Sequence, residues 1–189
     1  MRLSLHNRSL LILGGTLAGL VLILYAVSQV ILGGDAARAE GQAVQREVRR
    51  FQDVLAGELA GLDGTGHDYA VWDDSYAFLE SGDPDFVALN LADTTFTNLR
   101  LTLIAFVHRQ HGLVYAQAFD LAQAAPVAMP AGLAAFLASD PRLASAIDDD
   151  VHTTGVLNLP EGVWLVTVHP VLTSEGAGPS RGYLVMGRY

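Results

Sequence analysis

The chain has 189 residues, of which 51% are hydrophobic, and a formal net charge of −9. Its length suits one domain plus an appendage. The acidic balance excludes a nucleic-acid-binding surface, because phosphates repel negative charge. Cysteine is absent, which excludes disulfides and cysteine-based zinc sites.

The first expected element is a transmembrane helix over residues 9–34, where no charged residue occurs. About 20 apolar residues cross a hydrocarbon core of about 30 Å. A cleaved signal peptide is the alternative, since residues 37–39 read Ala-Arg-Ala, but signal h-regions run only about 7–15 residues. Because Arg2 and Arg8 precede the stretch, residues 1–8 are expected in the cytoplasm, with the span in the inner membrane and the rest outside.

A stalk helix is predicted over 35–66 as a continuation of the membrane helix. Apolar residues recur along it at spacings of three and four: Val44, Val48, Phe51, Leu55, Leu59 and Leu62. This stripe either packs on the domain's own sheet or forms a seam with a second copy. A homodimer through the stalk is therefore expected, with both interpretations open. Gly61, Gly64 and Gly66 are predicted to end the helix.

An α+β domain is predicted over 67–189. Short helices are expected over 69–79, 85–91, 131–137 and 141–147, and strands over 101–108, 113–119, 153–159, 163–171 and 182–188. The economical arrangement is a five-stranded antiparallel sheet with helices packed on one face.

Aromatic and acidic residues gather in the first short helix. Tyr69, Trp72 and Tyr76 share one helix face, and Asp73 and Asp74 lie beside it. The rings could be core anchors whose polar atoms find internal partners. The alternative is that they form the wall of a ligand site, with a carboxylate that accepts hydrogen bonds from the ligand.

Residues 68–78, Asp-Tyr-Ala-Val-Trp-Asp-Asp-Ser-Tyr-Ala-Phe, resemble the CHASE extracellular sensor domains, type four, of bacterial and archaeal signalling receptors. The resemblance continues through the rest of the chain at Phe86, Asn90, Leu91, Phe96, Leu99, Gly112, Gly162, residues 169–171 and residues 182–188. It implies a PAS-like fold of the Cache group. It also implies a periplasmic sensor that passes its signal through the stalk to a cyclase, phosphodiesterase or histidine kinase module absent from this sequence.

The expected function is thus binding of an unknown small ligand or a partner by a membrane-anchored sensor. The candidate ligand-binding residues are Tyr69, Trp72, Asp73, Asp74, Tyr76, Asn90 and Arg109. A structural or protein-interaction module without a small ligand is the first alternative, and a secreted hydrolase is the second.

No catalytic residue, cofactor or metal ligand is expected. The sequence has no Gly-x-Ser-x-Gly motif. Asp73 and Asp74 would point about 100° apart on a helix, so they cannot flank one substrate bond. His108 and His111 flank a turn, and two imidazoles are too few for a metal site.

Overall fold

The fold is described from a computed structural model. The structure describes the backbone of residues 5–139, 143 and 151–189. It describes the side chains of the same residues, except those of residues 5–8, 10–12 and 29–43. The chain divides into two compact units, Met1–Val54 and Leu55–Tyr189, which we describe separately. The predicted helix over 141–147 lies outside the described residues, apart from residue 143.

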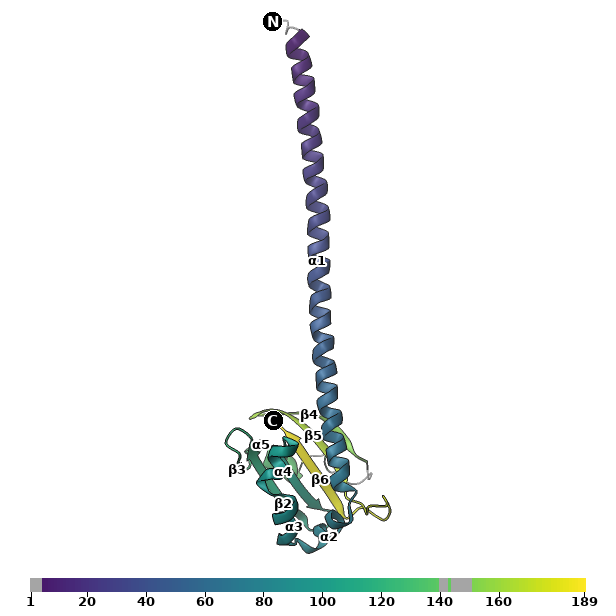
Figure 1. Ribbon diagram of the computed structural model, residues 1–189, viewed down its shortest axis with the longest axis vertical. Helices are drawn as coiled ribbons and strands as arrows, with labels where there is room; N and C mark the ends of the chain where they lie inside the picture. The colour runs from purple at the N-terminus through teal and green to yellow at the C-terminus, as the bar shows by residue number, and fades with distance from the viewer. Residues whose placement is uncertain (1–4, 140–142, 144–150) are drawn as a thin grey trace. The chain divides into compact units, whose positions relative to one another are not determined.

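The longest element is the helix α1, Leu5–Ala70, which is continuous through the predicted segments 9–34 and 35–66 (Figure 1). The prediction that glycines end the stalk helix is wrong, since α1 runs past Gly66 to Ala70. A Cβ at Gly66 would stand 2.7 Å from Cγ2 of Thr167 and 2.8 Å from Cδ2 of His169. This glycine therefore allows close packing of the helix on the sheet.

In the first unit, almost all described side chains of α1 are exposed. Within the described residues, none of the helices is both long and apolar enough to cross a membrane. The transmembrane helix predicted over 9–34 is accordingly not found there.

Three short helices follow α1: α2 (Asp73–Ser81), α3 (Pro84–Asn90) and α4 (Asp93–Leu99). The chain leaves α1 where Val71 forms a parallel bridge with Leu172 and Trp72 adopts an extended backbone. Asp83 caps α3, because its carboxylate accepts a hydrogen bond of 2.9 Å from the backbone N–H of Asp85. Helix α4 was not predicted.

The sheet has six antiparallel strands in the order β3-β2-β1-β6-β5-β4. The strands are β1 (Leu103–His108), β2 (Gly112–Asp120), β3 (Ala125–Val127), β4 (Thr153–Leu159), β5 (Gly162–Pro170) and β6 (Gly182–Arg188). The expected count of five is wrong because the short edge strand β3 pairs with β2. The antiparallel α+β architecture itself is confirmed.

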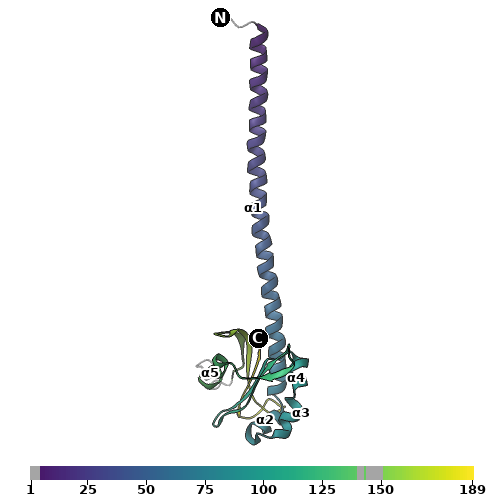
Figure 2. The same ribbon diagram turned by 90° about the vertical axis from the view of Figure 1, so that its left-hand side faces the viewer.

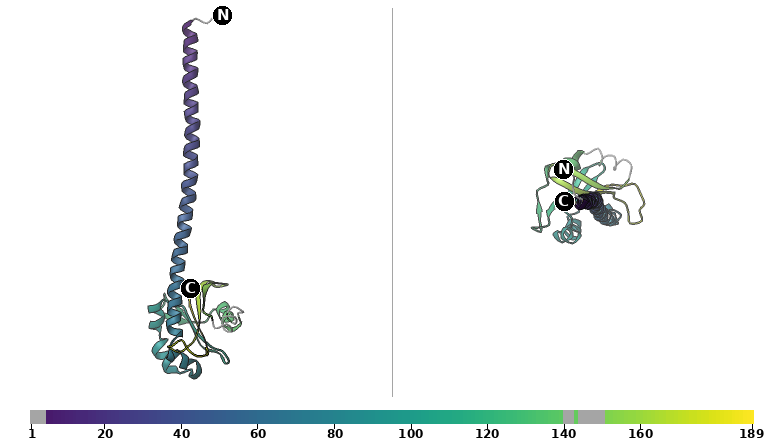
Figure 3. Two further views of the ribbon diagram at one scale, coloured as in Figure 1. Left: turned by 90° about the vertical axis from the view of Figure 1, so that its right-hand side faces the viewer. Right: turned by 90° about the horizontal axis from the view of Figure 1, so that it is seen from above.

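Different helices cover the two faces of the sheet, because successive strand residues point to opposite faces. On one face, Ile104 and Phe106 share a core with α2, α3, α4 and the end of α1. On the other face, Leu103 and Ala105 share a core with α5 (Ala131–Ser139). Figures 2 and 3 show α5 on the opposite side of the sheet from α3 and α4. The expectation of helices on one face only is therefore wrong.

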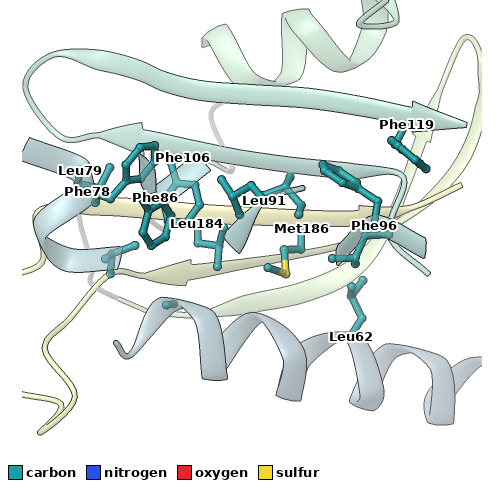
Figure 4. Packing of buried hydrophobic residues seen from close by; sticks show 14 residues of the cluster. Leu62, Phe78, Leu79, Phe86, Leu91, Phe96, Phe106, Phe119, Leu184 and Met186 are labelled. Carbon is teal, nitrogen blue, oxygen red and sulfur yellow. The ribbon is translucent and has the colours of Figure 1, made fainter. Parts of the chain in front are cut away.

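The core on the α2–α4 side is aromatic (Figure 4). Phe78 of α2 stacks on Phe86 of α3 at 4.4 Å between ring centroids, and it meets Phe106 of β1 edge-on at 5.1 Å. Leu62 of α1 is fully buried in the same core. One cluster thus holds these elements together, and the lower end of the predicted stripe packs on the domain's own sheet.

Candidate ligand-binding site

A pocket of about 690 Å³ lies between the β1–β2 hairpin and α5. Most of its lining is apolar and consists of Val107, Leu113, Ala116, Met129, Leu137 and Leu143. Pockets that bind small organic molecules have volumes of about 300–1,000 Å³ and are mostly apolar. In size and lining, this pocket fits that description.

Short side chains keep the pocket open. Ala134 and Ala138 of α5 and Ala116 of β2 all line it, and none extends beyond Cβ. Helix α5 is held in place from its other side, where Leu133 and Phe136 are buried in the core. The helix therefore attaches to the sheet by large residues, and two of the residues that it presents to the pocket are alanines.

A guanidinium lies beside the apolar lining. Arg109 follows β1 directly, and its backbone N–H donates a hydrogen bond of 2.9 Å to the carbonyl of Arg181. Its Nη2 donates to Oη of the fully buried Tyr183 at 3.1 Å. Gly112, with φ of 76°, adopts the left-handed conformation that lets the hairpin turn tightly at this point. The site can thus offer apolar contact together with a positive charge.

The His108 side chain at the end of β1 is buried. Its Nδ1 accepts hydrogen bonds from the backbone N–H groups of Gln110 at 3.0 Å and His111 at 3.1 Å. A proton on Nε2 is consistent with this pattern, and Nε2 lies 3.6 Å from Oε1 of Glu80. Among the described residues, no group of three histidine, aspartate or glutamate side chains could hold a metal ion.

The predicted aromatic wall is part of the core on the opposite face. Tyr69 and Trp72 are part-buried and meet edge-on at 6.3 Å, and Trp72 packs against Phe86 at 5.8 Å. Burial raises the pKa of Tyr69 above its ordinary value, although a hydrogen bond with Thr95 opposes this. Asn90 ends α3, and its backbone carbonyl accepts a hydrogen bond of 3.0 Å from Oγ1 of Thr95. These contacts support the core-anchor interpretation.

Asp73 and Tyr76 bind the loop between β5 and β6. The Asp73 carboxylate accepts from the backbone N–H of Ser174 at 3.0 Å, and its own N–H donates to Oγ of Ser174 at 3.1 Å. The guanidinium carbon of Arg181 lies 3.8 Å above the Tyr76 ring, and Tyr76 Oη donates to the carbonyl of Pro179 at 3.3 Å. Both residues therefore fasten this loop to α2. Asp74 is exposed in the first turn of α2.

Of the seven predicted site residues, only Arg109 lines the pocket. The apolar lining from β2 and α5 was not predicted from the sequence. One signal was available: the predicted helix over 131–137 has no charged residue on any side, so even its exposed face is apolar. That signal indicates an apolar surface, but it does not say which element faces it.

The CHASE4 domain matches residues 54–189. The chain belongs to the CHASE4 family. The match covers the whole second unit, so the sheet, the short helices and the pocket are all parts of the CHASE4 domain. The resemblance to the type-four CHASE sensor domains is therefore confirmed. CHASE4 domains are a family of sensor domains.

One relative is the methanogenesis regulatory histidine kinase FilI of Methanothrix harundinacea (strain 6Ac), which is 26% identical over 186 residues. The aligned region is 98% of this chain but only 21% of that protein.

Two solved structures are distantly similar. The extracellular domain of vpHK1S-Z8, assigned as a histidine kinase, has a TM-score of 0.48 at 15% identity and covers 76% of this chain and 52% of that one. A domain assigned to the sensory box/GGDEF family from Vibrio parahaemolyticus has a TM-score of 0.36 at 13% identity. The aligned region covers 76% of this chain and 55% of that one. Neither similarity is high enough to carry an argument about this chain.

Proposed function

We propose that this CHASE4 domain is a sensor that binds a small, largely apolar organic molecule between the β1–β2 hairpin and α5. The observation that supports the proposal is the pocket of about 690 Å³, with its apolar lining and the adjacent guanidinium of Arg109. Convergence of apolar walls with a few polar groups is the usual form of a small-molecule site. This pocket replaces the aromatic face of Tyr69, Trp72 and Tyr76 as the candidate site.

A route from the pocket to α1 runs through the sheet. Val107 at the pocket pairs with Tyr183 of β6. At the far end of β6, Arg188 donates from Nη1 to Oε2 of Glu58 on α1 at 2.8 Å, and from Nη2 to the carbonyl of Leu99 at 3.1 Å. A ligand shifts a conformational equilibrium only by the difference of its affinities for the two states. In this proposal, movement of the hairpin reaches α1 through β6.

In this proposal the domain catalyses no reaction and acts on an output module through α1. It lies outside the cytoplasm, in the periplasm or the extracellular space, which membership of a family of sensor domains supports. A single N-terminal helix anchors it in the inner membrane. The uncharged stretch over 9–34 supports the anchor, and Arg2 and Arg8 before it support a cytoplasmic N-terminus.

A pair of alanines on α5 tests the site. Ala138 lines the pocket, and Ala135 is exposed on the same helix without lining it. The probe is the fluorophore anilinonaphthalene sulfonate (ANS), which combines apolar rings with one negative charge. Ala138→Trp should fill the pocket and weaken ANS binding by at least about tenfold, which is about 1.4 kcal/mol. Ala135→Trp should bind the probe as the unaltered chain does.

Equal binding by the Ala138→Trp variant and the unaltered chain, with both folded by circular dichroism, would remove the pocket from the account. Arg109→Gln gives a second comparison. It should weaken binding of ANS more than binding of N-phenyl-1-naphthylamine, the same ring system without the sulfonate. If the unaltered chain binds neither probe, the domain is better explained as a protein-interaction module.

A further inference from the structure

One carboxylate on α1 contacts polar groups of two strands, β4 and β5. Oδ1 of Asp63 on α1 accepts a hydrogen bond from Oγ1 of Thr154 on β4. It also lies 3.3 Å from Oγ1 of Thr167 and 3.0 Å from Nε2 of His169, both on β5. The two threonine hydroxyls are 2.7 Å apart. This cluster lies on the α1 side of the sheet, away from the pocket.

Three imidazoles meet at the same place. His169 is buried, with 3% of its surface exposed. The His152 ring stacks on it at 5.2 Å and 6° between planes, and the His67 ring meets it edge-on at 5.9 Å. Among the described residues, the titratable groups that face His169 are thus Asp63 and His67 on α1 and His152 just before β4. The neutral hydroxyls of Thr154 and Thr167 complete its surroundings.

The surroundings favour an ionised Asp63 and a neutral His169. Burial lowers the pKa of the His169 imidazole, and this outweighs the attraction of Asp63, while His152 and His67 lower it further. Burial alone would raise the pKa of the Asp63 carboxyl. The hydrogen bond from Thr154 and the imidazoles of His169 and His152 outweigh this effect, so the net pKa lies below the ordinary value. At neutral pH, Nε2–H of His169 therefore donates to the Asp63 carboxylate.

We propose that the Asp63–His169 cluster is a pH-responsive contact, which holds the end of α1 against β4 and β5 while His169 is neutral and releases it on acidification. In the neutral ring Nδ1 is the free base, and it takes up one proton from solvent. The resulting imidazolium is buried, and the imidazoles of His152 and His67 packed against it oppose the added charge. The buried cation then disfavours the closed contact.

The direction of the pH effect follows from proton linkage. Because the pKa of His169 is lowered in the folded state, its contribution to stability is complete above the ordinary histidine pKa of about 6.5. Below that pH the unfolded or opened chain binds more protons than the closed one, so the closed state loses stability as the pH falls. The closed state loses no further stability once the pH is below the pKa of His169 in that state.

Amide hydrogen exchange of the full chain tests the proposal at about pH 7.5 and about pH 5.5, on either side of the ordinary histidine pKa. After correction for intrinsic rates, exchange in residues 59–70 should be about tenfold faster at the lower pH, which lies about one unit below the ordinary histidine pKa. Exchange in β6 should change less. His169→Gln keeps a donor for Asp63 but cannot gain a charge, and it should abolish most of the increase.

His111→Gln is the matched control, because His111 stacks on His108 at the hairpin turn outside the cluster. It should keep the pH effect of the unaltered chain. The same pH effect in His169→Gln as in the unaltered chain would overturn the proposal. If His169→Gln does not fold, a nuclear magnetic resonance titration of the unaltered chain tests the proposal instead. His169 should then gain its proton below the ordinary histidine range, and amide exchange in residues 59–70 should rise over the same pH interval. Protonation of His169 without that rise in exchange would overturn the proposal.

Discussion

Gly66 lies where α1 packs tightly on β5. A methyl group there would stand 2.7 Å from Cγ2 of Thr167 and 2.8 Å from Cδ2 of His169, both held in the Asp63 cluster. Gly66→Ala should therefore lower the free energy of unfolding by about 1–3 kcal/mol, as overpacking of a tight contact does. Urea unfolding followed by tryptophan fluorescence measures this, since Trp72 and Trp164, the two tryptophans, lie in the second unit.

Gly61 is the matched control on the same helix. A Cβ there would meet nothing within 4 Å. Gly61→Ala should raise the free energy of unfolding by up to about 1 kcal/mol, because alanine has a higher helix propensity than glycine. If the two substitutions had the same effect, the close approach at Gly66 would not be real.

The sequence suggests what such residues can do, but only the fold shows which use is made of them. Gly66 was predicted to end a helix, because a glycine near the end of a periodic stretch commonly does. The structure gives it a packing role, since its neighbours come from β5, about a hundred positions later in the chain. For the same reason the sequence left Trp72 open between anchor and ligand wall, and its packing against Phe86 supports the anchor.

At the scale of elements, the predicted stripe on α1 divides into two parts. Leu62 is buried in the core, and Leu55 and Leu59 are part-buried. Val44 and Phe51 remain 63% and 68% exposed. The lower part therefore covers the domain's own sheet, and the upper part is free to pair with a second copy. We propose a homodimer through this upper part, because aligned apolar residues on two helices form a seam.

Cysteine substitutions test the homodimer, since the chain has no cysteine of its own. Disulfide crosslinking should be strong for Val44→Cys, Val48→Cys and Phe51→Cys. It should be weak for the controls Gln45→Cys and Gln52→Cys, which the stripe leaves out. Uniform or absent crosslinking would leave the stripe without a partner copy.

The success of element prediction followed the strength of the local pattern. The strands β4 and β6 agree with the predicted strands over 153–159 and 182–188. Both are runs rich in β-branched and aliphatic residues, and clear turn signals mark their ends. The strand β3 was missed, since Ala125–Val127 is short and contains proline, which is typical of an edge. The face that α5 covers depends on tertiary packing, which periodicity does not report.

At the scale of the molecule, attachment to a membrane remains a proposal from the uncharged stretch over 9–34. The chain should stay in the membrane fraction after extraction with alkaline carbonate. Leu20→Arg should weaken insertion, because a charge near the centre of a span costs about 2.5–3.5 kcal/mol. Val48→Arg lies outside the stretch and should leave extraction unchanged. Complete release of the unaltered chain by carbonate would contradict the anchor.

The class of the domain was readable from the sequence, whereas the pocket was not. A local motif around Trp72 pointed to the CHASE4 family, which the match over 54–189 confirms. The pocket, in contrast, is built by the β1–β2 hairpin and α5, which comes later in the chain and meets the hairpin only in the folded domain. Of the predicted site, Arg109 alone came to lie there, because it directly follows a strand that forms the pocket wall.

The central claim is that a ligand binds between α5 and the β1–β2 hairpin. A crystal structure of the full chain with ANS, at a concentration that saturates binding in solution, tests it most directly. The account predicts density for the probe against Ala138 of α5 and Leu113 of β2, which both line the pocket. Density beside Trp72 and Tyr76 on the opposite face, with this pocket empty, would contradict it.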